Sequence, residues 1–224
     1  MEKEKKKKFN VKKFVIFIVF LIFLIIGLLF LVRARVRNII IVNNNYYSDE
    51  EIIETAKIDD YPRFLLLNGS RIKNRLLKLD LVEDAKVSKK WGFIVKIDVT
   101  EKKILYFVRS KQEYMTSNYK TYKLDNVIGK PTLINFVPEN IEKSFVKEFS
   151  KLDNNIIDLI SEIEYSKTNY DEKRFLFYMN DGNEVYITIS RIELMNKYID
   201  IVKKLSNKNG ILYLDSGNYF EIKK

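Results

Sequence analysis

The longest apolar run of the chain occupies residues 14–32 and reads FVIFIVFLIFLIIGLLFLV. It holds no charged, amide or hydroxyl side chain, and every position except Gly27 is Phe, Val, Ile or Leu. These residues favour insertion at the centre of a membrane-spanning helix. A helix of this length rises roughly 28 Å, about the thickness of a bilayer core. The run therefore predicts a transmembrane helix with a short N-terminal side and a long C-terminal side.

Short strand and helix patterns follow the apolar run. The sequence RNIIIV at 37–42 is rich in β-branched residues, which predicts a strand. Ser48 begins the sequence S-D-E-E, and Glu51 completes a capping box that predicts the start of a helix. Ser70 is predicted to open a second helix. The apolar side chains predicted to face inward from these two helices are Ile52, Ile53, Ala56, Ile72, Leu76 and Leu77.

Residues 82–103 alternate between apolar and polar positions on both sides of a turn at Trp91-Gly92. The alternating apolar residues are Ala85, Val87, Phe93, Val95, Ile97 and Val99. A period of two predicts a hairpin of two strands with one buried face. The predicted order is strand, helix, helix, strand, strand, which indicates a compact α+β unit.

The remaining residues, 105–224, predict several short strands and two helices. The strands are expected at 119–124, 132–136, 175–179, 184–189, 211–214 and 219–222. Asn180-Asp181-Gly182-Asn183 predicts a hairpin turn in which Gly182 supplies the positive φ. One helix is indicated by Ile141, Phe145 and Phe149, and a longer one by Ile192, Met195, Ile199 and Val202. Gly210 is expected to end the longer helix and its connection.

The formal net charge of +10 suggests a nucleic-acid partner until the charges are located. Residues 1–13 hold seven lysines against Glu2 and Glu4, and three arginines follow the apolar run at 33, 35 and 37. From residue 38 onward the chain carries 30 basic and 28 acidic residues. A nearly neutral main part does not suit a phosphate-binding surface, so no nucleic-acid partner is expected.

The flanking charges predict the direction of the anchor. Seven lysines before the run against three arginines after it favour a cytoplasmic N-terminus by the positive-inside rule. A cleaved signal peptide is the alternative, since Val32-Arg33-Ala34 offers small residues to a peptidase. The length of the run and the surrounding arginines favour a retained anchor. The lysine-rich tail at 1–13 is expected to lie against membrane lipid.

Candidate catalytic chemistry is sparse. The chain contains no cysteine and no histidine, which excludes disulfides and thiolate metal sites and removes the commonest general base. The S-x-x-K motif of penicillin-binding proteins occurs three times, a frequency that chance explains in a lysine-rich chain, and no Lys-Thr-Gly follows. The three pairs are Ser70/Lys73, Ser117/Lys120 and Ser144/Lys147. We expect no catalytic residue, no metal and no cofactor.

The hairpin sequence VEDAKVSKKWGFIVKIDVTEKK resembles the closing hairpin of a POTRA domain, with its A-x-V strand, basic turn and I-x-V-x-E strand. The KKW turn makes it most similar to the DivIB branch of the DivIB/FtsQ cell-division proteins. Gly92 stands where that family tends to have proline. The resemblance implies a single transmembrane helix plus an α+β extracytoplasmic region, in which a POTRA domain precedes a mixed β-sheet domain with flanking helices. The expected parts are a basic cytoplasmic tail at 1–13, a transmembrane helix at 14–32, a POTRA domain at 36–104 and a β domain at 105–224.

YMNDGNEVYITI and the closing LDSGNYF also resemble the β domain of DivIB. In that family the last strands receive coiled-coil partners, FtsL and DivIC (FtsB in the other branch). The resemblance implies the partner-binding positions Leu214, Ser216, Gly217, Tyr219 and Glu221. Independently of the family, an edge strand offers unpaired N–H and C=O groups to a partner strand. The alternative is that Tyr219 and Phe220 only complete a core.

The resulting expectation is a non-enzymatic, single-pass division protein at the septum. Its partners would be FtsL-like and DivIC/FtsB-like bitopic proteins and the septal transpeptidase. Two alternatives belong to other classes: a membrane-anchored cell-wall enzyme, and a POTRA-type chaperone or transport module. The second would normally precede a membrane β-barrel, and no long series of alternating ten-residue segments follows.

Overall fold

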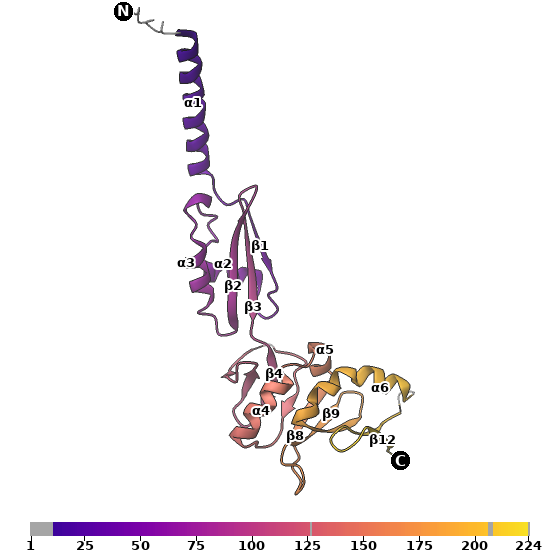
Figure 1. Ribbon diagram of the computed structural model, residues 1–224. Coiled ribbons are helices and arrows are strands. Elements are labelled where there is room, and N and C mark those ends of the chain that lie inside the picture. The colour runs from indigo at the N-terminus through magenta and orange to yellow at the C-terminus, as the bar shows by residue number, and fades with distance from the viewer. Residues whose placement is uncertain (1–10, 126, 206–207, 224) are drawn as a thin grey trace, which may run out of the picture. The chain divides into compact units, whose positions relative to one another are not determined.

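The computed structural model describes residues 11–125, 127–205 and 208–223 (Figure 1). Most of the predicted basic tail, residues 1–10, lies outside the described residues. The chain divides into two compact units, Met1–Glu101 and Lys102–Lys224. The division falls just before the expected domain boundary at 104/105.

The predicted transmembrane helix at 14–32 lies within α1 (Val11–Arg33). No residue of α1 is buried against the rest of the chain. By length and composition α1 could cross a membrane, and among the described residues it is the one helix that could. Its apolar surface requires a nonpolar environment, because about twenty consecutive apolar side chains are otherwise left in water.

The first unit contains the predicted strand–helix–helix–strand–strand order. Its elements after α1 are β1 (Asn38–Val42), α2 (Asp49–Ala56), the short 3₁₀ helix η1 (Phe64–Leu66), α3 (Gly69–Leu76), β2 (Val82–Lys90) and β3 (Ile94–Glu101). The sheet order is β1-β3-β2, with β1 parallel and β2 antiparallel to β3. Apolar side chains of α2 and α3 pack with the inward residues of this sheet in one core. The predicted α+β unit is confirmed.

Local capping explains where the two helices begin. The Ser48 hydroxyl accepts the Glu51 N–H at 3.2 Å, and the Glu51 carboxylate accepts the Ser48 N–H at 2.9 Å, so the predicted capping box is confirmed. The second helix is capped by Asn68, whose side chain accepts the Arg71 N–H at 3.1 Å. The prediction that Ser70 opens this helix was therefore wrong. Leu77, predicted to face inward, is 40% exposed because α3 ends at Leu76.

The second unit has a nine-stranded sheet of order β12-β11-β10-β9-β8-β7-β4-β5-β6. The strands are β4 (Ile104–Val108), β5 (Glu113–Thr116), β6 (Thr121–Tyr122), β7 (Thr132–Leu133), β8 (Ile160–Tyr165), β9 (Arg174–Met179), β10 (Glu184–Thr188), β11 (Gly210–Tyr213) and β12 (Tyr219–Ile222). The helices are α4 (Glu139–Phe149), α5 (Asn154–Ile157), the 3₁₀ helix η2 (Ile189–Lys197) and α6 (Tyr198–Lys204). Both α4 and η2 pack in one apolar core with the sheet. The predicted mixed sheet with flanking helices is confirmed.

Three predicted elements of this unit differ from the structure. The strand expected at 119–124 is reduced to β6, and that expected at 132–136 is reduced to β7. The single long helix expected to follow residue 189 is a 3₁₀ helix, η2, that continues into α6. Gly210 begins β11 instead of ending the helical passage. Ile189, Ile192, Met195 and Tyr198 are the buried positions, at the spacing of three that matches the three residues per turn of a 3₁₀ helix.

Candidate functional site: the C-terminal edge of the sheet

Strand β12 forms one end of the nine-stranded sheet. Among the described strands its neighbour is β11, with which it pairs antiparallel from Tyr213↔Tyr219 to Gly210↔Ile222. The Lys223 N–H donates to the Asn209 carbonyl at 3.2 Å. Because backbone groups alternate in direction along a strand, the N–H and C=O groups of Phe220 and Ile222 face away from β11. The opposite side of β12 is therefore an open hydrogen-bonding edge.

The five predicted partner-binding residues lie together in β12 and in the turn before it. Ser216 and Glu221 are exposed, Tyr219 is 53% exposed and Gly217 is partly exposed. Leu214 is 2% exposed: its side chain belongs to the core, and its N–H donates to the Tyr186 carbonyl at 2.8 Å. Four of the five positions are thus on the surface, whereas Leu214 packs in the core beneath the turn. Their role in binding stays a prediction.

A row of aromatic side chains crosses the sheet towards this edge. The rings of Tyr213 and Tyr219 stack with centroids 4.4 Å apart, and those of Tyr186 and Tyr213 lie 5.4 Å apart. The Arg174 guanidinium carbon lies 3.7 Å from the centroid of the Tyr186 ring. The row therefore joins β9, β10, β11 and β12 on the face opposite to the buried phenylalanines of β9. Stacked cross-strand pairs of this kind stiffen the edge.

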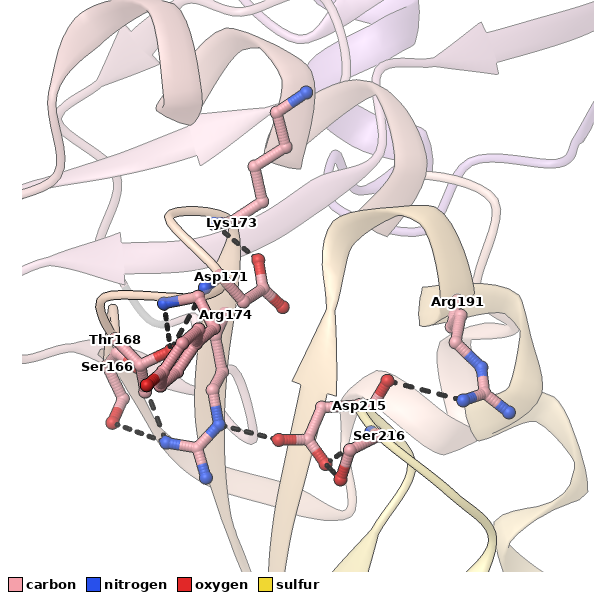
Figure 2. Close-up of polar contacts among 9 residues, drawn as sticks. Ser166, Thr168, Asp171, Lys173, Arg174, Arg191, Asp215 and Ser216 are labelled. Carbon is pink, nitrogen blue, oxygen red and sulfur yellow. Dashed lines mark hydrogen bonds and ion pairs between the residues drawn. The ribbon is translucent and has the colours of Figure 1, made fainter.

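The turn between β11 and β12 is held by two arginines from other elements, as Figure 2 shows. Arg174 Nε of β9 donates to Asp215 Oδ2 at 2.7 Å, and only 16% and 10% of the two side chains are exposed. Arg191 of η2 donates to the Asp215 carbonyl at 3.3 Å and to Asn218 Oδ1 at 2.8 Å. The turn is thus ordered by contacts with distant parts of the chain.

The charge state of Asp215 follows from these contacts. Burial acts to raise the pKa of Asp215, but the hydrogen bonds from Arg174 and from the Ser216 N–H outweigh it. The net effect holds the pKa below the ordinary carboxyl value. Asp215 is therefore ionised at neutral pH and keeps its ion pair with Arg174.

A buried polar network supports the other end of β11. The Asn183 side chain is 2% exposed; its Oδ1 accepts the Gly210 N–H at 2.8 Å and its Nδ2 donates to the Tyr198 hydroxyl at 3.0 Å. The Tyr198 hydroxyl donates in turn to the Asp181 carboxylate at 2.8 Å. Gly182 has φ +85°, as predicted for the hairpin turn that carries Asp181 and Asn183. The NDGN turn therefore positions the first residue of β11 as well as joining β9 to β10.

Gly210→Ala is expected to destabilise the second unit by about 2 kcal/mol, since overpacking typically costs 1–3 kcal/mol. A Cβ at residue 210 would collide with the carbonyl oxygen of Glu221 and lie 2.6 Å from Phe220 Cζ. Both contacts belong to β12, so the strand must shift away from β11. Hydrogen exchange of the Tyr219, Glu221 and Lys223 amides, which face β11, should accelerate in the full chain.

Gly69→Ala is the matched control for this substitution. Its Cβ would meet Val87 at 3.5 Å, an ordinary contact, within the first turn of α3. The expected change in stability is within about 0.5 kcal/mol. Unchanged exchange of the β12 amides in Gly210→Ala would show that β12 does not depend on this close approach.

Arg174, Arg191, Asp215 and Asn183 are the residues of this site that sequence reasoning missed. Arg174 and Asp215 lie 41 residues apart in the chain, and Asn183 and Gly210 lie 27 apart. One local signal was available: the aspartate at the start of the D-S-G turn often accepts backbone N–H groups, as Asp215 does from Ser216.

Residues of the three S-x-x-K motifs take part in ordinary structural contacts. Lys73 forms an ion pair with Asp84, and the Ser144 hydroxyl donates to the Asn140 carbonyl at 3.1 Å within α4. The Ser117 hydroxyl accepts the Lys103 N–H at 3.3 Å. Within the part of the chain that the structure describes, no group of three or more acidic side chains could hold a metal ion.

Comparison with known proteins identifies the family that this chain resembles. A family profile described as "POTRA domain, FtsQ-type" matches residues 34–102, which cover the part of the first unit that follows α1 and one residue beyond it. Cell division protein DivIB of Brevibacillus brevis is 26% identical over 196 residues, covering 84% of this chain and 74% of that protein. Cell division protein DivIB of Listeria monocytogenes is 26% identical over 233 residues, covering 99% of this chain and 85% of that protein.

The chain is similar over most of its length to DivIB proteins of the DivIB/FtsQ cell-division family. The resemblance predicted from the hairpin at 82–103 is confirmed, and the first unit is an FtsQ-type POTRA domain. Helix α1 is the candidate membrane span of this chain, and the matched relatives are named as cell-division proteins. A solved structure, the major extracytoplasmic domain of DivIB from Geobacillus stearothermophilus, shares 23% identity with a TM-score of 0.39, covering 48% of this chain and 96% of that one.

Proposed function

We propose that this chain is a non-enzymatic scaffold of the division septum. In this proposal the N-terminus is cytoplasmic, α1 spans the membrane, and both folded units lie outside it. The C-terminal edge captures FtsL-like and DivIC/FtsB-like bitopic proteins, and the assembly engages the septal transpeptidase. The observation that carries the proposal is the open edge of β12.

The edge has the features that β-strand addition needs. The outward backbone groups of Phe220 and Ile222 offer hydrogen bonds along β12 without prior unfolding. Ile222 is 53% exposed, and Tyr219 and Glu221 place side chains beside the incoming strand. Backbone pairing supplies affinity, and alternate side-chain contacts supply selectivity between partners.

The turn and edge of β12 are ordered before a partner binds, which favours a role in partner capture over that of a passive surface. The Arg174–Asp215 ion pair, the Arg191 contacts and the tyrosine row fix the turn and the edge before a partner arrives. A surface that is already ordered loses little conformational entropy on binding. An edge strand that merely completed a core would not require a turn held from two other elements.

A non-enzymatic role fits the composition of the chain. Histidine and cysteine are absent from the sequence, so the commonest general base and thiol nucleophile are missing. The seven lysines of residues 1–13 support a cytoplasmic N-terminus beside anionic lipid. The two units would then be concentrated at the outer face of the cell membrane, where the septal wall is made.

Ile222→Pro is expected to weaken co-purification of FtsL-like and DivIC-like partners about tenfold. Proline removes one outward N–H and places its ring on the pairing edge, which blocks an added strand. The N–H of Ile222 does not bond to β11, so the pairing of β12 with β11 remains. The measurement is affinity co-purification of the partners with the full chain from solubilised membranes.

Ile222→Ala is the matched control, since it shortens the same side chain and keeps the N–H. It should retain most of the captured partner. Deletion of residues 211–224 would be a poorer test, because it removes Leu212 and Leu214 from the core. Equal capture by Ile222→Pro and wild type would refute pairing at this edge.

A further inference from the structure

Three large apolar side chains of the first unit are exposed at one end of the POTRA fold. Leu65 and Leu66 of η1 are 48% and 70% exposed, and Trp91 in the β2–β3 turn is 100% exposed. Single exposed apolar residues are common, but grouped ones mark a surface that binds something apolar.

Backbone hydrogen bonds tie both segments to the residues that follow α1. The Phe64 N–H donates to the Ala34 carbonyl, the Val36 N–H to the Pro62 carbonyl and the Arg37 N–H to the Phe93 carbonyl, each at 2.9 Å. Ala34 is the residue directly after the end of α1. Because consecutive Cα atoms are 3.8 Å apart, η1 and the β2–β3 turn lie close to the point where α1 ends, whatever its tilt.

The exposed residues stand on a fixed base. The rings of Phe64 and Phe93 meet edge to face with centroids 5.5 Å apart, which joins η1 to the β2–β3 turn. Lys89 Nζ donates to the Leu65 carbonyl at 3.1 Å and lies 5.3 Å from the centroid of the Phe64 ring. These contacts leave Leu65, Leu66 and Trp91 on the outside.

Basic residues surround the same end. The exposed cations are Arg33, Arg35, Arg37, Arg63, Lys89 and Lys90. Arg35 and Arg63 face each other across an isolated antiparallel bridge, an arrangement of like charges that is unfavourable in the absence of an anion. In the described parts of the chain, no carboxylate forms a salt bridge with either arginine. The Arg35 guanidinium donates to the Asp60 carbonyl at 3.4 Å. Within the described residues, the apolar side chains of this end are therefore exposed and its two facing arginines have no carboxylate partner.

We propose that this end of the POTRA domain inserts into the headgroup layer of the bilayer leaflet at which α1 ends. Trp91, Leu65 and Leu66 enter the boundary between headgroups and acyl chains, where tryptophan is favoured. Arg35, Arg63 and their basic neighbours bind lipid phosphates. A lipid surface is the occupant because the end is covalently adjacent to the membrane-spanning helix and combines apolar tips with a ring of cations. This proposal is independent of the partner-binding edge.

Trp91 is the single tryptophan of the chain, so its fluorescence reports directly on the environment of this end. The full chain is reconstituted in vesicles of phosphatidylcholine and phosphatidylglycerol, and Trp91 fluorescence is measured with brominated phospholipids or with acrylamide in the water. We expect strong quenching by the brominated lipids, a blue-shifted emission and protection from acrylamide. Quenching by acrylamide without quenching by brominated lipid would overturn the proposal.

Two matched variants separate insertion from general proximity to the membrane. Leu65→Ser/Leu66→Ser should lose most of the quenching by brominated lipid, whereas Leu77→Ser, another exposed leucine at the end of α3, should retain it. A tryptophan moved to exposed Thr100 of β3, in Trp91→Phe/Thr100→Trp, lies roughly 20 Å along the sheet and should be quenched far less. Equal quenching at residues 91 and 100 would also overturn the proposal.

Discussion

Phe145→Ala is expected to destabilise the second unit by about 4 kcal/mol, within the 3–5 kcal/mol range of such substitutions. Phe145 is 0% exposed and stacks on Phe175 with centroids 4.1 Å apart. Its ring also lies within 5.0 Å of Phe149 and 5.8 Å of Tyr106, measured between centroids. The cavity would lie between α4 and the sheet, where these three neighbours and Phe177, whose ring centroid lies 6.2 Å away, cannot all move in to fill it.

Buried methionines allow this effect to be assigned to the correct unit. Met115, Met179 and Met195 all lie in the core of the second unit, so their methyl NMR signals report its unfolding in urea within the full chain. Phe136→Ala is the control, because Phe136 is 83% exposed and its loss should change stability by less than about 0.5 kcal/mol. Similar urea midpoints for Phe145→Ala and Phe136→Ala would contradict the assignment of this core.

Local patterns predicted the first unit well because its signals act over a few residues. The capping box at Ser48 and Glu51 is satisfied within one turn of α2. The alternation in residues 82–103 survives because β2 and β3 pair continuously from Asp84↔Thr100 to Lys90↔Ile94. Each of these features depends on spacing alone, and spacing is what a sequence displays.

The second unit was less predictable because several of its strands lack a clear period. Strand β4 reads ILYFV, an apolar run with no alternation, and such a run does not distinguish a buried strand from a helix. Strand β8 reads ISEIEY, and a register irregularity between Ile160 and Glu162 interrupts its alternation. The spacings of three and four among Ile192, Met195, Ile199 and Val202 predicted an α-helical face, whereas residues 189–197 form a 3₁₀ helix, which is uncommon at nine residues.

Two features of the site differ in how far the sequence reveals them. One is the position of β12 at the end of the sheet, and the other is the set of contacts that hold its turn. The first was implied by the family resemblance. The second depends on which distant side chains the fold brings together, such as Arg174 of β9 and Asp215. No local pattern marks such a pair, so the residues that order the site became visible only in the structure.

Arg174→Met is expected to destabilise the second unit by about 3 kcal/mol, the lower end of what breaking a buried ion pair costs. It leaves Asp215 ionised and little exposed, and it removes the guanidinium from the face of Tyr186. The turn before β12 then loses its main support. We expect partner co-purification to fall with stability, since a mobile turn must be ordered at the moment of binding.

Arg109→Met is the control for loss of an arginine from an ion pair. Arg109 NH2 and Glu162 Oε1 are 3.0 Å apart, but 56% and 42% of the two side chains are exposed. An exposed pair contributes less than about 1 kcal/mol, so this variant should remain close to wild type in stability and capture. Equal losses in the two variants would show that burial of the Arg174–Asp215 pair does not matter.

The effect of Arg174→Met should also depend on pH in a defined direction. In the wild type the pKa of Asp215 is lowered from the ordinary value of 3.8, so the ion pair contributes its full stability above that value. As the pH falls through the lowered pKa, the carboxylate is protonated and the contribution is lost. The stability difference between wild type and Arg174→Met, measured by urea titration of the methionine signals, should therefore shrink below about pH 4. A difference that stays constant to acid pH would mean that Arg174 acts through packing on Tyr186, and the turn would then be ordered by Arg191 and the tyrosine row instead.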